Sequence, residues 1–170
     1  MYVPSTVTAT CSSSSTLRGA FVVRWLLSSH NPVDAKICHC RQCQVLHGAP
    51  FQWAVICDKS AVRFTSGVDE LYFYNGESDR AQRILPCKLS CQRCRSPIAD
   101  EGRRMFLAFG PLFDFGHPPQ IPAAFQPTCH FFYGARVIDI NDDKPKYLAQ
   151  DAGLERERGN VFVFAVDPFQ

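Results

Sequence analysis

The chain has 170 residues, of which 46% are hydrophobic, and its 18 Lys and Arg against 16 Asp and Glu give a net charge of +2. This length can bury a core without help from metals or disulfides, and the 14 Phe argue against a disordered chain. The sequence contains no run of Lys and Arg, so it does not predict the basic surface that is typical of nucleic-acid-binding proteins. No apolar stretch approaches the length of a membrane-spanning helix.

The nine cysteines are expected to be reduced. The apolar stretch over residues 20–27 is short, is interrupted by Arg24 and follows no basic leader, so it does not resemble a signal peptide. The cytosol keeps thiols reduced, which favours metal binding over disulfide bonds. We therefore expect a cytoplasmic protein whose cysteines hold metal.

Most of the chain consists of short segments rich in β-branched and aromatic residues between turn formers, which predicts strands. The predicted strands cover residues 21–27, 51–57, 61–65, 71–74, 104–109, 130–133, 136–140 and 161–166. Helical periodicity predicts at most a turn or two over residues 42–46. Residues 111–127 hold five of the twelve prolines and are expected to be irregular. We expect a single mainly β domain over residues 1–170.

The strongest chemical signal is the segment 38–43, which reads Cys-His-Cys-Arg-Gln-Cys. In an extended segment Cys38 and Cys40 point to one face and His39 to the other, and a following turn can bring Cys43 to the same ion. Three thiolates leave the fourth tetrahedral position of zinc open, as in catalytic zinc sites. The alternative is that these cysteines are small apolar core residues.

A second cysteine cluster contains the C-x-x-C pair Cys91 and Cys94. Such a pair on a tight turn is typically half of a structural zinc site with four ligands. Cys11 and Cys87 are the thiols available for the other half. A redox-active pair is the alternative, but no βαβ pattern surrounds it.

Three segments together resemble the glutathione-dependent formaldehyde-activating enzyme family, which shares a domain with centromere protein V. They are the motif at 38–43, His-Gly-Ala-Pro-Phe at 47–51 and Cys-x-x-Cys-x-Ser-Pro-Ile at 91–98. The resemblance spans residues 8–148 and leaves 149–170 as a C-terminal extension. It implies an Mss4-like fold of stacked antiparallel β-sheets with few short helices. The segments 100–104 and 130–139 look closest to a fungal branch.

The resemblance implies that Cys38, Cys40 and Cys43 are catalytic zinc ligands. The namesake reaction is a carbon–sulfur lyase step, in which glutathione adds reversibly to formaldehyde to give S-hydroxymethylglutathione. Zinc can stabilise a thiolate or polarise a carbonyl, and three thiolates favour the first role. We therefore expect a zinc-dependent enzyme acting on a small molecule, with glutathione as a candidate co-substrate and with no nucleic-acid or membrane partner.

The resemblance also implies that Cys91 and Cys94 are half of a structural zinc site. The other half in the family is a C-x-C pair near the N-terminus, but here Ser13 stands where the second cysteine would follow Cys11. A serine hydroxyl is a poor zinc ligand. Either this site is lost, or Cys87 completes a set of four thiols, so the chain is expected to hold one or two zinc ions.

Four further residues are candidates for the site. Arg41, Arg103 and Arg104 could bind the carboxylates of glutathione through forked hydrogen bonds, although a solvated surface position is an equal alternative for each. His47 could move a proton near the metal, or it could be a structural neighbour of the ligands.

Two other functions remain open from the sequence. One is a zinc-assisted tailoring step of fungal secondary metabolism without glutathione, because fold does not fix substrate. Six aromatic residues support this alternative if they contact a large apolar substrate, although they could equally fill the core. They are Phe51, Trp53, Phe109, Phe113, Phe115 and Phe125. The other is a non-enzymatic scaffold on chromatin or the cytoskeleton, for which the chain lacks a basic extension.

Overall fold

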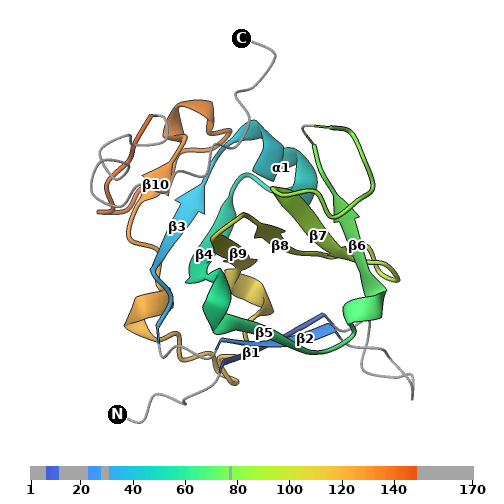
Figure 1. Ribbon diagram of the computed structural model, residues 1–170. Helices are drawn as coiled ribbons and strands as arrows, with labels where there is room; N and C mark the ends of the chain where they lie inside the picture. The colour runs from blue at the N-terminus through green and yellow to red at the C-terminus, as the bar shows by residue number, and fades with distance from the viewer. Residues whose placement is uncertain (1–6, 12–22, 28–30, 77, 149–170) are drawn as a thin grey trace.

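The computed structural model describes residues 7–11, 23–27, 31–76 and 78–148, which form two sheets and one α-helix in these ranges (Figure 1). The smaller sheet has the order β1 (Val7–Cys11), β2 (Val23–Leu27) and β5 (Val62–Ser66). The larger has seven strands in the order β10 (His130–Phe131), β3 (Asp34–Cys38), β4 (Gln52–Asp58), β9 (Met105–Phe109), β8 (Pro97–Glu101), β7 (Cys87–Cys91) and β6 (Leu71–Tyr74). All neighbours are antiparallel except β10, which is parallel to β3.

Helix α1 (Arg41–His47) follows β3, and five short 3-10 helices connect other described elements. They cover Lys59–Ala61, Val68–Glu70, Gly110–Leu112, Ala123–Phe125 and Tyr133–Ala135. Residues 110–127 otherwise lack regular structure, as their prolines predict.

The two faces of the seven-stranded sheet differ in chemistry because side chains alternate along each strand. The core face carries Ala35, Val55, Cys57, Leu89, Cys91, Ala99, Phe106 and Ala108, all buried in one hydrophobic cluster. On the opposite face, here called the site face, the strand register places Cys38 beside Gln52, Ala54 beside Phe109, Leu107 beside Asp100, and Asp100 beside Lys88.

The smaller sheet and the proline-rich segment both cover the core face. Leu27 of β2 is fully buried in the core cluster, and Phe64 of β5 meets Phe106 edge to face at 6.0 Å. From the 110–127 segment, Phe113 and Phe125 pack in the same cluster. Apolar burial of this kind contributes about 25 cal/mol per Å², so the core face holds most of the hydrophobic stabilisation.

A buried carboxylate at the edge of the core is neutralised from two sides. Glu101 is 4% exposed and forms ion pairs with Lys59 at 2.6 Å and Arg83 at 2.5 Å. Burial raises the pKa of Glu101, but the hydrogen bonds from Arg83 and Lys59 outweigh it and hold the pKa below its usual value. The paired charges fix the β8–β9 turn against the loop that precedes β7.

The structure confirms the predicted mainly β architecture, and five predicted strands (21–27, 51–57, 61–65, 71–74 and 104–109) match β2, β4, β5, β6 and β9 closely. The predicted strand at 136–140 is wrong. The Tyr133 hydroxyl binds the Ile140 N–H at 2.8 Å and Arg136 pairs with Asp139, so this segment folds onto itself. The predicted strand at 130–133 ends at Phe131.

Sequence patterns did not predict β1, β3, β7 and β8. β3, β7 and β8 carry Lys36, Lys88 and the Asp100-Glu101 pair, so their apolar alternation is interrupted by charged residues. The fold buries Lys36, Asp100 and Glu101 and half-buries Lys88, all of them in ion pairs. The predicted strand at 161–166 and the expected extension at 149–170 lie outside the described residues.

The close approach of Gly110 to Trp53 gives a test of the packing. A Cβ at Gly110 would lie 2.0 Å from Cδ2 of Trp53, whose ring is held by a hydrogen bond from Nε1 to the Phe125 carbonyl at 3.0 Å. Gly110→Ala should therefore lower the free energy of unfolding by about 2–3 kcal/mol in urea titrations. Gly76→Ala is the matched control, since its Cβ would meet Tyr74 at an ordinary 3.7 Å. Equal stability of both variants would contradict this packing.

Candidate metal centre

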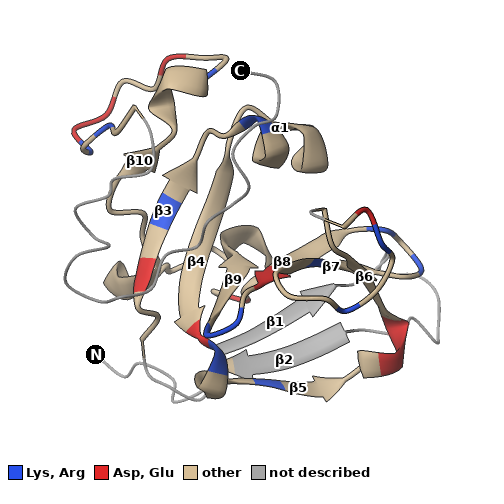
Figure 2. Ribbon diagram, turned by 45° about the horizontal axis from the view of Figure 1, so that its top comes forward, with Lys and Arg blue, Asp and Glu red and all other residues tan. Residues whose placement is uncertain are grey.

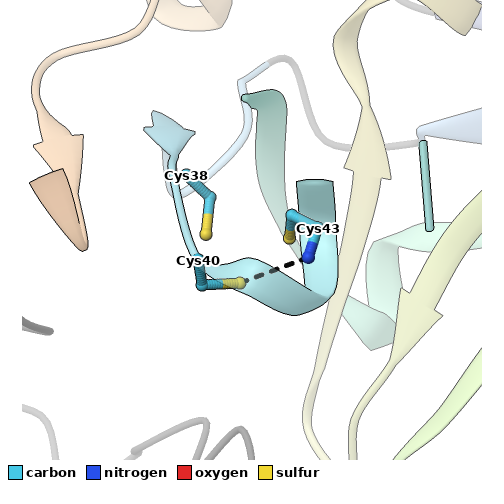
Figure 3. A group of neighbouring side chains, drawn as sticks. All are labelled: Cys38, Cys40 and Cys43. Atoms are coloured by element: carbon cyan, nitrogen blue, oxygen red, sulfur yellow. Dashed lines mark hydrogen bonds between the residues drawn. The ribbon is translucent and has the colours of Figure 1, made fainter. Parts of the chain in front are cut away.

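The three cysteines of the 38–43 segment come together at one end of the site face. Cys38 ends β3, Cys40 precedes α1, and Cys43 lies in the first turn of α1. Their sulfur atoms all lie within 4.8 Å of one another (Figure 3). A strand, an extended residue and a helical turn thus converge three thiols on one point.

The local sequence explains the short helix that carries Cys43. Cys40 is extended (φ −63°, ψ 151°), and its sulfur accepts a hydrogen bond from the Cys43 N–H at 3.4 Å, as an N-cap does. Gly48 ends the helix in the left-handed region (φ 57°), and its N–H binds the Gln44 carbonyl. Glycine adopts this conformation without strain, so the helix stops after two turns.

The protonation of the three thiols is shared. Hydrogen bonds from Cys38 and Cys43 lower the pKa of Cys40 to about 3, so its sulfur is ionised at neutral pH. The hydrogen bond with Cys40 raises the pKa of Cys38 to about 12. Hydrogen bonds with Cys38 and Cys40, and then burial, raise the pKa of Cys43 well above its usual value. At neutral pH, full ionisation of the cluster is therefore favoured only when a cation lies among the sulfurs.

The donor set fits a metal ion. Tetrahedral coordination with metal–sulfur bonds of about 2.3 Å separates two sulfurs by about 3.8 Å, so the observed cluster needs little rearrangement. Within the described part of the chain, no fourth His, Cys, Asp or Glu joins this group. The described residues thus offer three ligands to a metal and leave its fourth position for another molecule.

His39, between Cys38 and Cys40, points away from the cluster into a buried histidine pair. Its Nε2 lies 2.8 Å from Nδ1 of His130, and Nε2 of His130 lies 3.0 Å from the Asp142 carboxylate. A carboxylate oxygen can only accept, so Nε2 of His130 donates to Asp142, and one hydrogen bond joins the rings of His39 and His130. Burial, and then the charges of His130 and Arg136, lower the pKa of His39 to about 4, so this residue is neutral.

Backbone hydrogen bonds also hold the cysteine segment 38–43 and the end of β3 against β10. The Ile37 N–H binds the Cys129 carbonyl at 3.0 Å, and the His39 N–H binds the Phe131 carbonyl at 2.9 Å. The buried side-chain amide of Gln44 donates to the carbonyls of His39 and Ala135 at 2.8 and 2.9 Å. These bonds tie the loop and α1 to the 128–148 segment.

His47, predicted as a proton-transfer candidate, lies at the end of α1, and its ring packs at right angles to the ring of Phe109 on the site face, with 4.4 Å between the ring centroids. Burial lowers the pKa of His47, and the charges of Asp100, Lys88 and Cys40 also act on it. His47 therefore lies near enough to Cys40 for the charge of this sulfur to act on its pKa.

Lys88 and Asp100, which the sequence reasoning missed, lie on the same face and form an ion pair at 2.9 Å. Burial lowers the pKa of Lys88, but the opposite effect of Asp100 and of the sulfurs of Cys43 and Cys40 is larger, so the net shift of this pKa is upward. The sequence offered one signal for this pair, namely two opposite charges that each stand among apolar residues. Only the strand register shows that they meet.

Three buried side-chain atoms lack a hydrogen-bond partner in the described residues, and two of them lie in this region. They are Nε2 of His47 and Oδ1 of Asp100; the third is Nδ1 of His39. An unsatisfied buried polar atom costs about 1–3 kcal/mol. A bound molecule that forms hydrogen bonds with these atoms would remove this cost.

The predicted arginines are divided by the fold. Arg41 starts α1 beside the cluster and is exposed. Arg103 and Arg104 are exposed in the β8–β9 turn, where they line a surface pocket with Asp58. β4 runs from Gln52, beside Cys38, to Asp58, a span of about 20 Å. The structure does not bring Arg103 and Arg104 to the cysteines.

The fold also separates the cysteines of the second cluster, as far as they lie in the described residues. Cys91 is buried and Cys94 is exposed on the β7–β8 turn, where the Cys94 thiol lies 3.2 Å from the Ser96 hydroxyl. Cys87 lies about 13 Å from Cys91 along β7, and burial and then the charge of Glu101 raise its pKa to about 11. The structure does not bring Cys87 to the C-x-x-C turn.

The side chain of Cys11 and all of Ser13 lie outside the described residues. The backbone of Cys11 pairs with Val23 in β1–β2, and the next residue of β2, Arg24, pairs with Ser66 at the end of β5. From Ser66 the chain continues through 68–70 to β6, which pairs with β7. This connection leads toward the end of β7 that carries Cys91.

Comparison with known sequences identifies one family. The family model described as "Glutathione-dependent formaldehyde-activating enzyme" matches residues 22–135, about two thirds of the chain. This range includes the three clustered cysteines, His47, Lys88 and Asp100. No curated protein matches the chain. In the described ranges, no helix is both long and apolar enough to cross a membrane.

The shared protonation predicts how metal affinity depends on pH. With Cys40 ionised and the pKa values of Cys38 and Cys43 raised, metal binding must displace about two protons. The association constant for zinc should therefore rise about 100-fold per pH unit between about pH 6 and 8, as measured by competition with a chelating dye. A slope near zero would show that the thiols are already ionised and would contradict the shared-proton cluster.

Proposed function

The chain belongs to the glutathione-dependent formaldehyde-activating enzyme family, and on this premise we propose that it is a zinc-dependent enzyme that reversibly joins the thiol of glutathione to a small aldehyde. This is a carbon–sulfur lyase reaction. The observation that carries the proposal is the group of three sulfurs within 4.8 Å, with no fourth protein ligand among the described residues. A metal held this way keeps a position for substrate, unlike a structural site with four protein ligands.

The chemistry of the ligands favours thiol delivery. When bound, zinc would supply a site at which a thiol is ionised at neutral pH. Cys38, Cys40 and Cys43 would contribute three negative charges, which weaken the attraction for a further anion but raise the nucleophilicity of sulfur. Lys88, whose charge interacts with Cys40 and Cys43, offsets part of this negative charge. Arg41 starts α1 between Cys40 and Cys43 in the sequence, so we propose it as the arginine that binds a substrate carboxylate.

We also propose a second, structural zinc ion on the β7–β8 turn. Cys91 and Cys94 have the C-x-x-C spacing of such sites, and the backbone of Cys11 leads toward the same corner of the fold. The distance of Cys87 from Cys91 makes it a poor fourth ligand. Without the cysteine that Ser13 replaces, this ion would have three thiolate ligands, so it should be held more weakly than the first.

One observation favours a second candidate function, a zinc-assisted step on another small molecule without glutathione. Arg103 and Arg104, the expected partners for glutathione carboxylates, lie at the far end of β4 from the cysteines. The aromatic residues give this alternative little support, since Phe113 and Phe125 are buried in the core. A requirement for glutathione separates the two candidates.

Zinc stoichiometry tests the metal assignment. Elemental analysis of the purified protein should find one or two zinc ions per chain, and a Cys38/Cys40/Cys43 triple-serine variant should contain one fewer. A fall from two to one supports both sites, whereas a fall from one to none supports only the site-face ion. A freshly purified wild type without zinc would contradict the proposal.

Catalysis can be tested by exchange NMR of formaldehyde with glutathione. Cys40→Ser should lower the enzyme-catalysed rate by about 100-fold or more, because loss of a ligand should cost at least as much as loss of a residue that supports one. Cys57→Ala is the matched control, since Cys57 is buried on the core face. Wild-type exchange no faster than the uncatalysed reaction would instead favour the glutathione-independent candidate.

A further inference from the structure

Three polar side chains share the site face with the cysteine cluster. Lys88 and Asp100 are directly paired across β7 and β8, and His47 approaches the same face from α1. Figure 2 shows basic residues on β7 beside acidic residues on β8. The charges of Asp100, Lys88 and Cys40 act on His47, and those of Cys40 and Cys43 act on Lys88. The thiols and these three groups therefore form one electrostatic neighbourhood built from four separate elements.

The ion pair fixes the orientation of Asp100. Lys88 Nζ binds Oδ2 at 2.9 Å, so one carboxylate oxygen is occupied. The other oxygen, Oδ1, is buried and has no partner in the described residues. Since Asp100 is 6% exposed, it cannot turn Oδ1 to bulk water without breaking the pair. Lys88 thus acts as a positioning residue that holds Oδ1 as an acceptor.

His47 presents a second group in need of a partner. Its Nε2 is buried and is also without a partner among the described residues, while its ring packs perpendicular to the ring of Phe109. An imidazole nitrogen can donate and a carboxylate oxygen can only accept. A hydroxyl group can serve both roles, because its oxygen accepts a hydrogen bond and its hydrogen donates one.

We propose that Nε2 of His47 and Oδ1 of Asp100 form a binding subsite for a substrate hydroxyl group. This inference rests on the proposed function, in which the sulfur of the substrate occupies the position left by the three cysteines. The substrate class is then a sulfur compound that carries a hydroxyl group one or two carbon atoms from its sulfur. The addition product of a thiol and an aldehyde has this arrangement. A thiol without a hydroxyl fills only the sulfur position.

Two small thiols can test this subsite without turnover. The zinc is replaced by cobalt, whose absorption reports a bound thiol, and the protein is titrated anaerobically with 2-mercaptoethanol and with ethanethiol. The hydroxyl also changes the acidity of the thiol, so the quantity compared is the ratio of the two affinities in wild type and in variants. His47→Phe, which keeps a ring against Phe109, should lower this preference for 2-mercaptoethanol about ten-fold.

Asp100→Asn is the second variant. Lys88 can only donate, so it should hold the amide oxygen and leave the NH₂ group at the position of Oδ1. An acceptor becomes a donor with little change in shape, and the preference should again fall about ten-fold. Asp58→Asn makes the same chemical change on an exposed residue at the far end of β4 and should leave the preference unchanged.

The outcomes separate this inference from the proposed function. If both thiols bind cobalt and the preference is the same in wild type and in His47→Phe and Asp100→Asn, the hydroxyl subsite is wrong while thiol binding at the metal stands. If neither thiol changes the cobalt spectrum of the wild type, the proposed function fails and the subsite with it. Ethanethiol binding at wild-type affinity shows that a variant has kept its fold and metal.

Discussion

Strand alternation through Cys38, His39 and Cys40 is the constraint on which the site depends. It directs two sulfurs to one face of the seven-stranded sheet and sends the intervening imidazole to the other. The sulfurs meet Cys43 from α1, and the imidazole meets His130 at 2.8 Å in the interior. A slip of one residue in the β3–β4 register would exchange these faces and destroy both arrangements.

The same alternation separates stability from chemistry throughout the large sheet. The core face carries the apolar cluster that holds the two sheets in contact, and at its edge the internally neutralised Glu101. The site face carries groups whose pairing is incomplete, such as Asp100 and His47. A protein tolerates unsatisfied polar atoms where a ligand completes them, because the cost is recovered on binding. Side chains on the site face can therefore be changed with less effect on the core than their burial suggests.

Sequence reasoning predicted the features that are local and missed those that depend on pairing across the sheet. The convergence of Cys38, Cys40 and Cys43 follows from spacing alone, and the mainly β architecture follows from composition. The ion pair of Lys88 with Asp100 depends on the register of β7 and β8, which no local pattern fixes. The separation of Arg103 from the cysteines likewise depends on the length and direction of β4. Residues far apart in the sequence can therefore meet at one site, and residues that the sequence assigns to one site can lie at opposite ends of a strand.

The parallel pairing of β10 with β3 has a consequence for the order in which the chain is made. His39 and His130 are 91 positions apart, as are Gln44 and Ala135. Translation at about 5–20 residues per second puts roughly 5–20 seconds between the emergence of the cysteine loop and that of its supports. During that interval the three thiols belong to a nascent chain without β10. The loop thus reaches its final geometry only late in synthesis, and metal acquired earlier would be bound by a flexible segment.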